Sequence, residues 1–178
     1  MEIPPVARIR QTLDQPVVRD ISATVRQSLR SSRLKSRLKP DASVAIAVGS
    51  RGIANVVTIV DAALREIESL GFRPFVVAAM GSHGGATDEG QRQLLADYGV
   101  TEERLGVPVK TDMDVVELGR NSLGFPVYWD KNAFAADAVV TISRVKPPTD
   151  FNGRVESGIL KMLVIGLGKR AGPSAVHQ

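Results

Sequence analysis

The fold is decided by a stretch in the first third of the chain, Val-Ala-Ile-Ala-Val-Gly-Ser-Arg-Gly at residues 44–52. Its first five residues are apolar without interruption, which is typical of a strand covered on both faces of a sheet. The glycines that follow allow a tight turn. Beyond them an apolar stripe from Val56 to Leu70, with Gly71 after it, predicts a helix. The sequence thus predicts a strand, a loop and a helix in succession.

The pattern Gly-Ser-x-Gly occurs twice, as Gly49-Ser50-Arg51-Gly52 and, 32 residues later, as Gly81-Ser82-His83-Gly84. Residues 75–79 before it are apolar and predict a second buried strand, and Thr87 or Asp88 after it is expected to cap a helix. Repeated strand–helix units predict a mostly parallel sheet with right-handed crossovers. The expected fold class is therefore α/β, a Rossmann-like, mostly parallel sheet with helices on both faces.

Weaker patterns surround these two units. They predict a strand at 5–12, a helix at 20–38, strands at 115–118 and 125–129 joined by a turn at 121–124, a helix or turn at 131–136, and a buried strand at 138–142. Residues 160–165 are apolar and fit either a strand or a helix. No low-complexity linker interrupts the chain, so residues 1–178 are predicted to form a single α/β domain.

Composition narrows the possible classes of protein. The chain is 43% hydrophobic and 24% charged, as soluble globular domains are. It has no cysteine, and only His83 and His177 offer imidazole, which excludes disulfide frameworks, iron–sulfur clusters and zinc fingers. No apolar run reaches the roughly 18 residues of a membrane span, and the N-terminus lacks a signal-peptide block. We expect a cytoplasmic protein with no membrane partner.

The net charge of +4 comes from one segment, residues 26–39, which holds six basic side chains. Without them the chain has 17 basic and 19 acidic residues, a balance of −2. A nucleic-acid footprint is one interpretation of this segment. A solvated helix face is favoured, because no aromatic side chains are interleaved with the charges. Nucleic acid is therefore an unlikely partner.

The two glycine loops are the first candidate site. Ligands of open α/β sheets bind at the carboxyl ends of the strands, so Arg51 and His83 are expected over one crevice. A guanidinium suits a carboxylate or a phosphate, and a neutral imidazole beside a helix N-terminus suits a general base. The alternatives are a surface arginine paired with an acid and a turn histidine bonded to the backbone.

Lys161 is the second candidate, because it lies inside the apolar run at residues 159–163. Burial would lower the pKa of its amine and make it nucleophilic. Spacing alone favours a lysine that extends its ammonium into water. The glycines at 166–169 match neither a phosphate loop, since Arg170 stands where serine or threonine is needed, nor a dinucleotide fingerprint.

Taken together, these motifs resemble the lactate racemase family of nickel-pincer-nucleotide enzymes. Gly49-Ser50-Arg51 resembles the family loop whose arginine holds the substrate carboxylate, and Gly81-Ser82-His83 resembles the loop whose histidine is an acid/base. Ser157-Gly158, with Lys161 three residues on, resembles the segment whose lysine carries the cofactor as a thioamide. His177 lies 16 residues after Lys161, where the family has its nickel ligand.

The resemblance implies an isomerase that racemises or epimerises a small 2-hydroxy acid by hydride transfer to a nickel-pincer nucleotide. It implies that Arg51 and His83 are catalytic, that Lys161, Ser157 and Gly158 bind the cofactor, and that His177 binds nickel. The alternative function is a non-catalytic α/β module that binds phosphate or carboxylate through the two glycine loops.

The chain departs from the family pattern in two ways. Relatives carry a second acid/base histidine shortly before the cofactor lysine, whereas residues 146–150 here read Lys-Pro-Pro-Thr-Asp. Asp150 is the expected substitute, although a carboxyl pKa near 4 matches neutral pH poorly. The chain also resembles the family's N-terminal domain only. We expect the C-terminal domain to be absent, activity to be incomplete, and residues 160–165 to contact that domain or a second copy.

Overall fold

The computed structural model describes residues 7–12, 16–144 and 158–176. Its elements in chain order are α1 (Ile21–Ser31), α2 (Leu34–Arg37), β1 (Ser43–Val48), α3 (Val56–Ser69), β2 (Arg73–Ala78), the short 3₁₀ turn η1 (Gly84–Ala86), α4 (Asp88–Asp97), α5 (Glu102–Leu105), β3 (Val109–Lys110), β4 (Val115–Arg120), β5 (Pro126–Asp130), α6 (Lys131–Ala135), β6 (Ala138–Ile142), α7 (Ile159–Lys161), the π-helical turn η2 (Met162–Gly166) and α8 (Ala171–Val176). Strands and helices alternate, and the predicted α/β class is confirmed.

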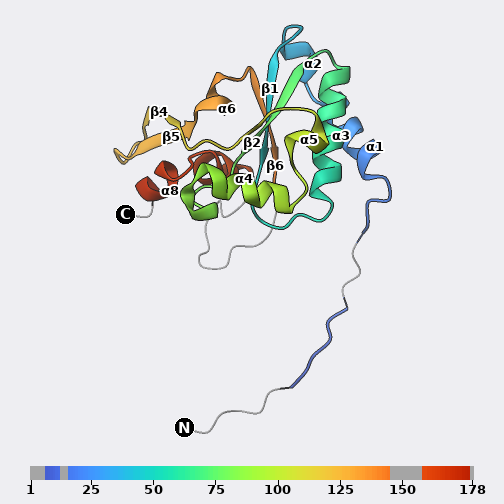
Figure 1. Ribbon diagram of the computed structural model, residues 1–178, viewed down its shortest axis with the longest axis horizontal. Helices are drawn as coiled ribbons and strands as arrows, with labels where there is room; N and C mark the ends of the chain where they lie inside the picture. Colours follow the sequence, from blue (N-terminus) through green and yellow to red (C-terminus); the bar gives the residue numbers. More distant parts are fainter. Residues whose placement is uncertain (1–6, 13–15, 145–157, 177–178) are drawn as a thin grey trace.

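In the described ranges, a parallel four-stranded sheet has the order β3-β2-β1-β6 (Figure 1). β1 lies in the middle, with Ile46 opposite Val76 of β2 and Val140 of β6. β2 and β3 therefore lie on one side of β1 in the sheet, and β6, which comes later in the chain, lies on its other side. Such a reversal is a topological switch point, beside which open α/β sheets bind their ligands. The predicted Rossmann-like parallel sheet is confirmed.

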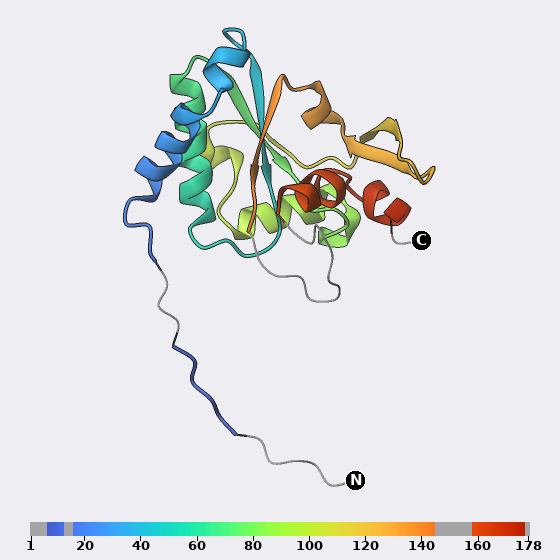
Figure 2. The same cartoon turned by 180° about the vertical axis from the view of Figure 1, so that it is seen from behind.

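The residues of β1 alternate between two hydrophobic layers, because successive strand side chains point to opposite faces. Val44, Ile46 and Val48 pack with α1 and α3 in the larger layer. Ala45 and Ala47 pack with α6 and the C-terminal segment in the smaller layer. Figures 1 and 2 show α1 and α3 on one side of the sheet and the C-terminal helices on the other. Helices cover both faces, as predicted.

The caps of α1, α3 and α4 follow from the sequence. The Asp20 side chain accepts the Ala23 N–H at 2.8 Å to begin α1, and the Thr87 hydroxyl accepts the Gly90 N–H to begin α4. Gly71 after α3 has a φ of +87°, and its N–H donates to the Glu68 carbonyl. A side chain is unfavourable at that φ, so a glycine ends this helix.

Two predicted boundaries at the N-terminus are wrong. Residues 7–12 of the predicted strand at 5–12 have no regular structure and are exposed, and no strand pairs with them. The predicted helix at 20–38 is broken into α1 and α2. At the break, Ser32 has extended backbone and its hydroxyl donates to the Leu29 carbonyl, which offers the chain an alternative to continued helix.

The second half of the chain follows the prediction with two refinements. β4 and β5 form a separate antiparallel pair across the predicted turn at 121–124, and α6 fills the range 131–135. The predicted buried strand at 138–142 is an edge strand, β6, and is only half-buried. Residues 160–165, left open between strand and helix, are helical in α7 and η2, with Leu160 and Val164 exposed.

Candidate functional site

The two glycine loops meet at the carboxyl ends of β1 and β2. The strands are parallel neighbours with Val48 opposite Ala78, so the loops that follow them leave the sheet side by side. The Ser50 hydroxyl and His83 Nδ1 share a hydrogen bond between the loops. The predicted juxtaposition of the two loops is therefore present in the structure.

The charges around His83 bring a third sequence-predicted residue into the site. Partial burial of the ring lowers the pKa of His83 below its usual 6.5, and the positive charges of Arg51 and Lys161 lower it further. Arg51 follows β1, His83 follows β2 and Lys161 ends α7. Both cations are therefore close enough to His83 for their charges to favour its neutral form.

Lys161 lies on the surface of the protein. The residue is exposed, although its neighbours in sequence are apolar. The interpretation of a buried, desolvated amine is therefore wrong, and the favoured reading of an ammonium in water holds. The physical reason is that successive side chains of a helix point in different directions, so Met162 enters the core while Lys161 stays outside.

The C-terminal segment at 158–176 docks directly on the two loops. Gly81 N–H donates to the Gly166 carbonyl at 3.0 Å. A Cβ on Gly166 would lie 2.7 Å from the Ala79 carbonyl oxygen, so only glycine permits this approach. Met162 covers Gly49 from the same side, with its sulfur 3.3 Å from where a Cβ would stand. Lys161 is thereby brought to the site by the contacts of Met162 and Gly166, which follow it in the chain.

A fully buried ion pair lies beneath this contact. Lys169 and Asp130 are both 0% exposed, and Nζ lies 3.1 Å from Oδ2. The ammonium also donates to the Ala78 carbonyl at 2.8 Å and to Gln91 Oε1 at 3.3 Å. Asp130 Oδ1 accepts the Ala133 N–H, which begins α6. Lys169 thus ties the C-terminal segment to β2, α4 and α6.

Gln91 carries this network up to the site. Its side-chain amide is buried and donates to the carbonyls of Gly81 at 2.9 Å and His83 at 3.3 Å. Sequence reasoning missed both Gln91 and Lys169, and considered the lysine only as part of a failed phosphate motif. No local signal identifies Lys169, since its partners Asp130, Ala78 and Gln91 lie 39 and more residues away in sequence.

Tyr98 is a further residue at the site that the sequence analysis did not identify. Its hydroxyl donates to the backbone carbonyl of Ser50 at 2.6 Å. Tyr98 ends α4, the helix that follows the His83 loop. The first loop is therefore held from the end of the second strand–helix unit.

Three predicted site residues, Asp150, Ser157 and His177, lie outside the described residues. Gly158 is described and begins α7 with a φ of +83°, a conformation that favours glycine. Within the described part of the chain, no group of three or more histidine, cysteine or acidic side chains could hold a metal ion.

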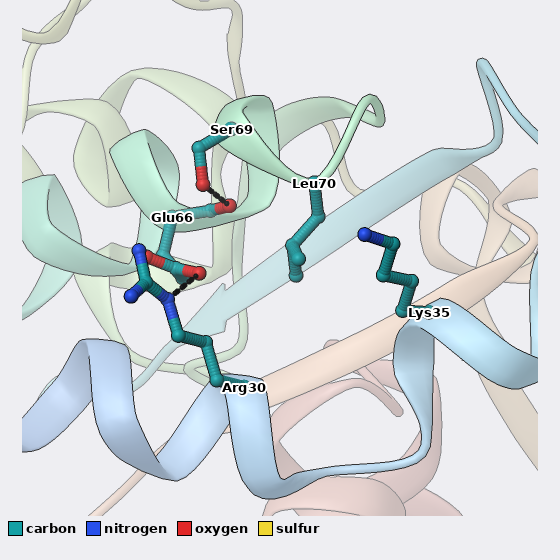
Figure 3. A pocket seen from close by; sticks show the side chains of 5 residues that line it. All are labelled: Arg30, Lys35, Glu66, Ser69 and Leu70. Carbon is teal, nitrogen blue, oxygen red and sulfur yellow. Dashed lines mark hydrogen bonds and ion pairs between the residues drawn. The ribbon is translucent and has the colours of Figure 1, made fainter.

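A shallow pocket of about 390 Å³ lies between α1, α2 and the end of α3, at the other end of the sheet. Figure 3 shows the side chains that line it. Its basic side chains are Arg30 and Lys35, and Arg30 donates to the buried Glu66 carboxylate at 2.8 Å. A second pocket, of about 460 Å³, borders the start of β6. Both are far from the strand carboxyl ends, where the fold places its ligands, so we assign the site to the glycine loops.

Searched within the described residues, no helix is long and apolar enough to cross a membrane.

Comparisons with known proteins identify the family of the chain. The chain matches no curated protein. A family model described as the lactate racemase N-terminal domain matches residues 6–177, a range that includes both glycine loops and Lys161. The chain therefore belongs to the lactate racemase N-terminal domain family.

Proposed function

We propose that this chain is the cofactor- and substrate-holding domain of a nickel-pincer-dependent enzyme that racemises or epimerises a 2-hydroxy acid. The observation that carries the proposal is that the Arg51 and His83 loops leave the sheet side by side, and that the charges of Arg51 and Lys161 act on His83. An arginine, a neutral imidazole and an exposed amine are three of the groups that this chemistry requires from the protein.

The residues present fit such a cofactor. The exposed amine of Lys161 is accessible for a thioamide link, and it stands beside the histidine that would act on the substrate. A pincer ligand brings its own carbon and sulfur donors to nickel, so the protein need add only one imidazole, for which we propose His177. A described chain without a cluster of metal-ligating side chains is consistent with that requirement.

When bound, the cofactor supplies a hydride acceptor and donor at the carbon that bears the hydroxyl group. The chain's own residues do the rest. Arg51 holds the substrate carboxylate through its guanidinium fork. His83 takes the hydroxyl proton, and its lowered pKa leaves the imidazole neutral and able to accept it. For the proton partner on the opposite face of the substrate we propose Asp150.

The test is cofactor attachment at Lys161. The chain is purified from cells that make the nickel-pincer nucleotide, and its intact mass and nickel content are measured for the wild type, Lys161→Ala and Lys161→Arg. We expect both variants to lose the mass increment, because neither offers an amine that can form the thioamide. Lys35→Ala, an exposed lysine at the other end of the sheet, is the control and keeps the increment. Full occupancy in Lys161→Ala contradicts the proposal.

The second candidate function is a non-catalytic anion-binding module. The positive charges of Arg51 and Lys161 beside the two glycine loops favour it, since such a field attracts phosphate or carboxylate without any cofactor. Calorimetry with inorganic phosphate and with a 2-hydroxy acid separates the two functions. Anion binding in the absence of any mass increment, and lost in Arg51→Ala, supports the module.

A further inference from the structure

Ser50 is held in place before any ligand arrives. Its backbone carbonyl accepts the Tyr98 hydroxyl at 2.6 Å, and the neighbouring Val48 carbonyl accepts the Ala79 N–H at 2.9 Å. Met162 covers Gly49 on the side of the C-terminal segment. These contacts fix the backbone from three elements, so the Ser50 hydroxyl has a defined position relative to the His83 ring.

The hydroxyl contacts one ring nitrogen only. Ser50 Oγ shares its hydrogen bond with Nδ1 of His83, which leaves Nε2 as the nitrogen for a ligand. The partner of one imidazole nitrogen decides which tautomer the ring adopts. A serine oxygen that accepts from Nδ1–H leaves Nε2 with its lone pair, the form that a general base needs.

The surrounding charges favour this neutral form. Arg51 and Lys161 oppose a further positive charge on His83. The carboxylate at the start of α4, Asp88, already has other partners. Its Oδ1 accepts a hydrogen bond from the Thr111 hydroxyl and one from Arg92, whose nitrogen is 3.4 Å away. A serine carries no charge, so it orients the ring while raising the pKa of His83 much less than a carboxylate partner would.

We propose that Ser50 is a positioning residue that accepts the Nδ1–H of neutral His83 and thereby fixes Nε2 as the proton-accepting nitrogen. Its role in turnover rests on the function proposed above, whereas the hydrogen bond itself does not. When Nε2 takes the proton of a substrate hydroxyl, Nδ1–H keeps its bond to Oγ, and the ring becomes imidazolium. When Nε2 returns the proton, the neutral ring is restored with the same tautomer.

The experiment is ¹⁵N NMR of the imidazole rings across a pH titration, on the full chain without cofactor. The chain has only two histidines, so His177→Gln assigns the His83 signals. For the wild type we expect the proton of neutral His83 on Nδ1. Ser50→Ala is expected to move it to Nε2 and to lower the pKa further, because the imidazolium loses a charge-assisted acceptor. Ser50→Thr keeps the hydroxyl and is expected to restore both values.

Two results overturn the proposal: a wild-type ring with its proton on Nε2, or a Ser50→Ala variant whose tautomer and pKa match the wild type. Should Ser50→Ala fail to fold, Ser50→Cys takes its place. Its sulfur accepts weakly, so the same shift is expected at smaller size, and an unchanged ring again overturns the proposal. The chain carries no cofactor in this experiment, so failed attachment at Lys161 would contradict the proposed function and leave this result unaffected.

Discussion

The two faces of the sheet are built in different ways. On the face of α1 and α3, branched side chains such as Val44, Ile46 and Val48 fill a continuous apolar layer. On the opposite face the same strand presents Ala45 and Ala47, and the C-terminal segment approaches closely. Only this second face carries a fully buried ion pair among the described residues. It is also the face that delivers Lys161 to the site.

The difference separates stability from positioning. Apolar area stabilises the first face in proportion to what it removes from water, with no preferred direction. A buried ion pair adds little net stability, because desolvation offsets the attraction, but removing one partner leaves a buried charge alone. Close contacts through glycine likewise fix where the segment at 158–176 lies. The contacts of the second face therefore fix the position of the C-terminal segment, whereas the apolar layer of the first face stabilises the fold.

Lys169→Met removes the buried ion pair of the second face, and we expect it to have the largest effect on the free energy of unfolding. Asp130 stays buried without its counter-charge, and we expect a loss of about 3–5 kcal/mol in the free energy of unfolding. Chemical denaturation measures this loss. The His83 NMR signals are also expected to shift, because Gln91 joins Lys169 to the His83 carbonyl.

Ile46→Ala is the matched control from the first face. Its side chain is fully buried, so a loss of about 2–5 kcal/mol is expected, with the His83 signals unchanged. The double variant Lys169→Met, Asp130→Asn removes both charges and should recover part of the stability. Equal shifts of His83 in Lys169→Met and Ile46→Ala would show that the two faces do not differ as described.

A smaller effect is expected from Gly166→Ala. The new Cβ would stand 2.7 Å from the Ala79 carbonyl oxygen, so the C-terminal segment must move away at a cost of about 1–3 kcal/mol. Thermal unfolding measures the cost, and attachment of cofactor at Lys161 is expected to fall with it. Gly52→Ala is the control, since its Cβ would meet nothing within 4 Å. Equal stability of the two variants would contradict the claim that the close contact at Gly166 holds the C-terminal segment in position.

The smallest expected effect is on the pH dependence of stability. The folded His83 has a lowered pKa, so as pH falls through about 6.5 the unfolded chain takes up a proton that the folded ring resists. Stability should therefore fall from that pH downward, until the folded ring is protonated too. The lowered pKa values of Glu103 and Asp137 act only at more acidic pH. Denaturation of His83→Gln across this range should show a flatter dependence; an unchanged slope contradicts the assignment.

Much of the fold could be predicted from local sequence. The apolar runs before Gly49 and before Gly81 correctly predicted β1 and β2, and the apolar stripe after Gly52 correctly predicted α3. The wrong predictions involved segments whose state depends on distant partners. Residues 7–12 have no strand beside them, and β6 is half-buried because it lies at an edge. Local pattern carries no information about either fact.

The candidate site divides in the same way. Arg51 and His83 were predicted from motif and spacing, since glycine loops after buried strands mark the carboxyl edge of a sheet. Lys161 was predicted only through the resemblance to the lactate racemase family, because spacing alone favoured a solvated lysine. Ser50, Tyr98, Gln91 and Lys169 were not identified as functional. Ser50, Tyr98 and Lys169 act through partners at least 33 residues away in sequence, and Gln91 is joined to Lys169 from 78 residues away.

The sequence by itself determined the α/β class, the parallel strands and the two glycine loops that hold Arg51 and His83. These depend on periodicity and on residue type, which are local. Tertiary structure alone decided that the charge of Lys161 acts on His83, that the Ser50 hydroxyl meets Nδ1, and that Lys169 is buried against Asp130. Those outcomes depend on strand order and on the close approach of the C-terminal segment, because hydrogen bonds and ion pairs act only over the few ångströms that folding brings together.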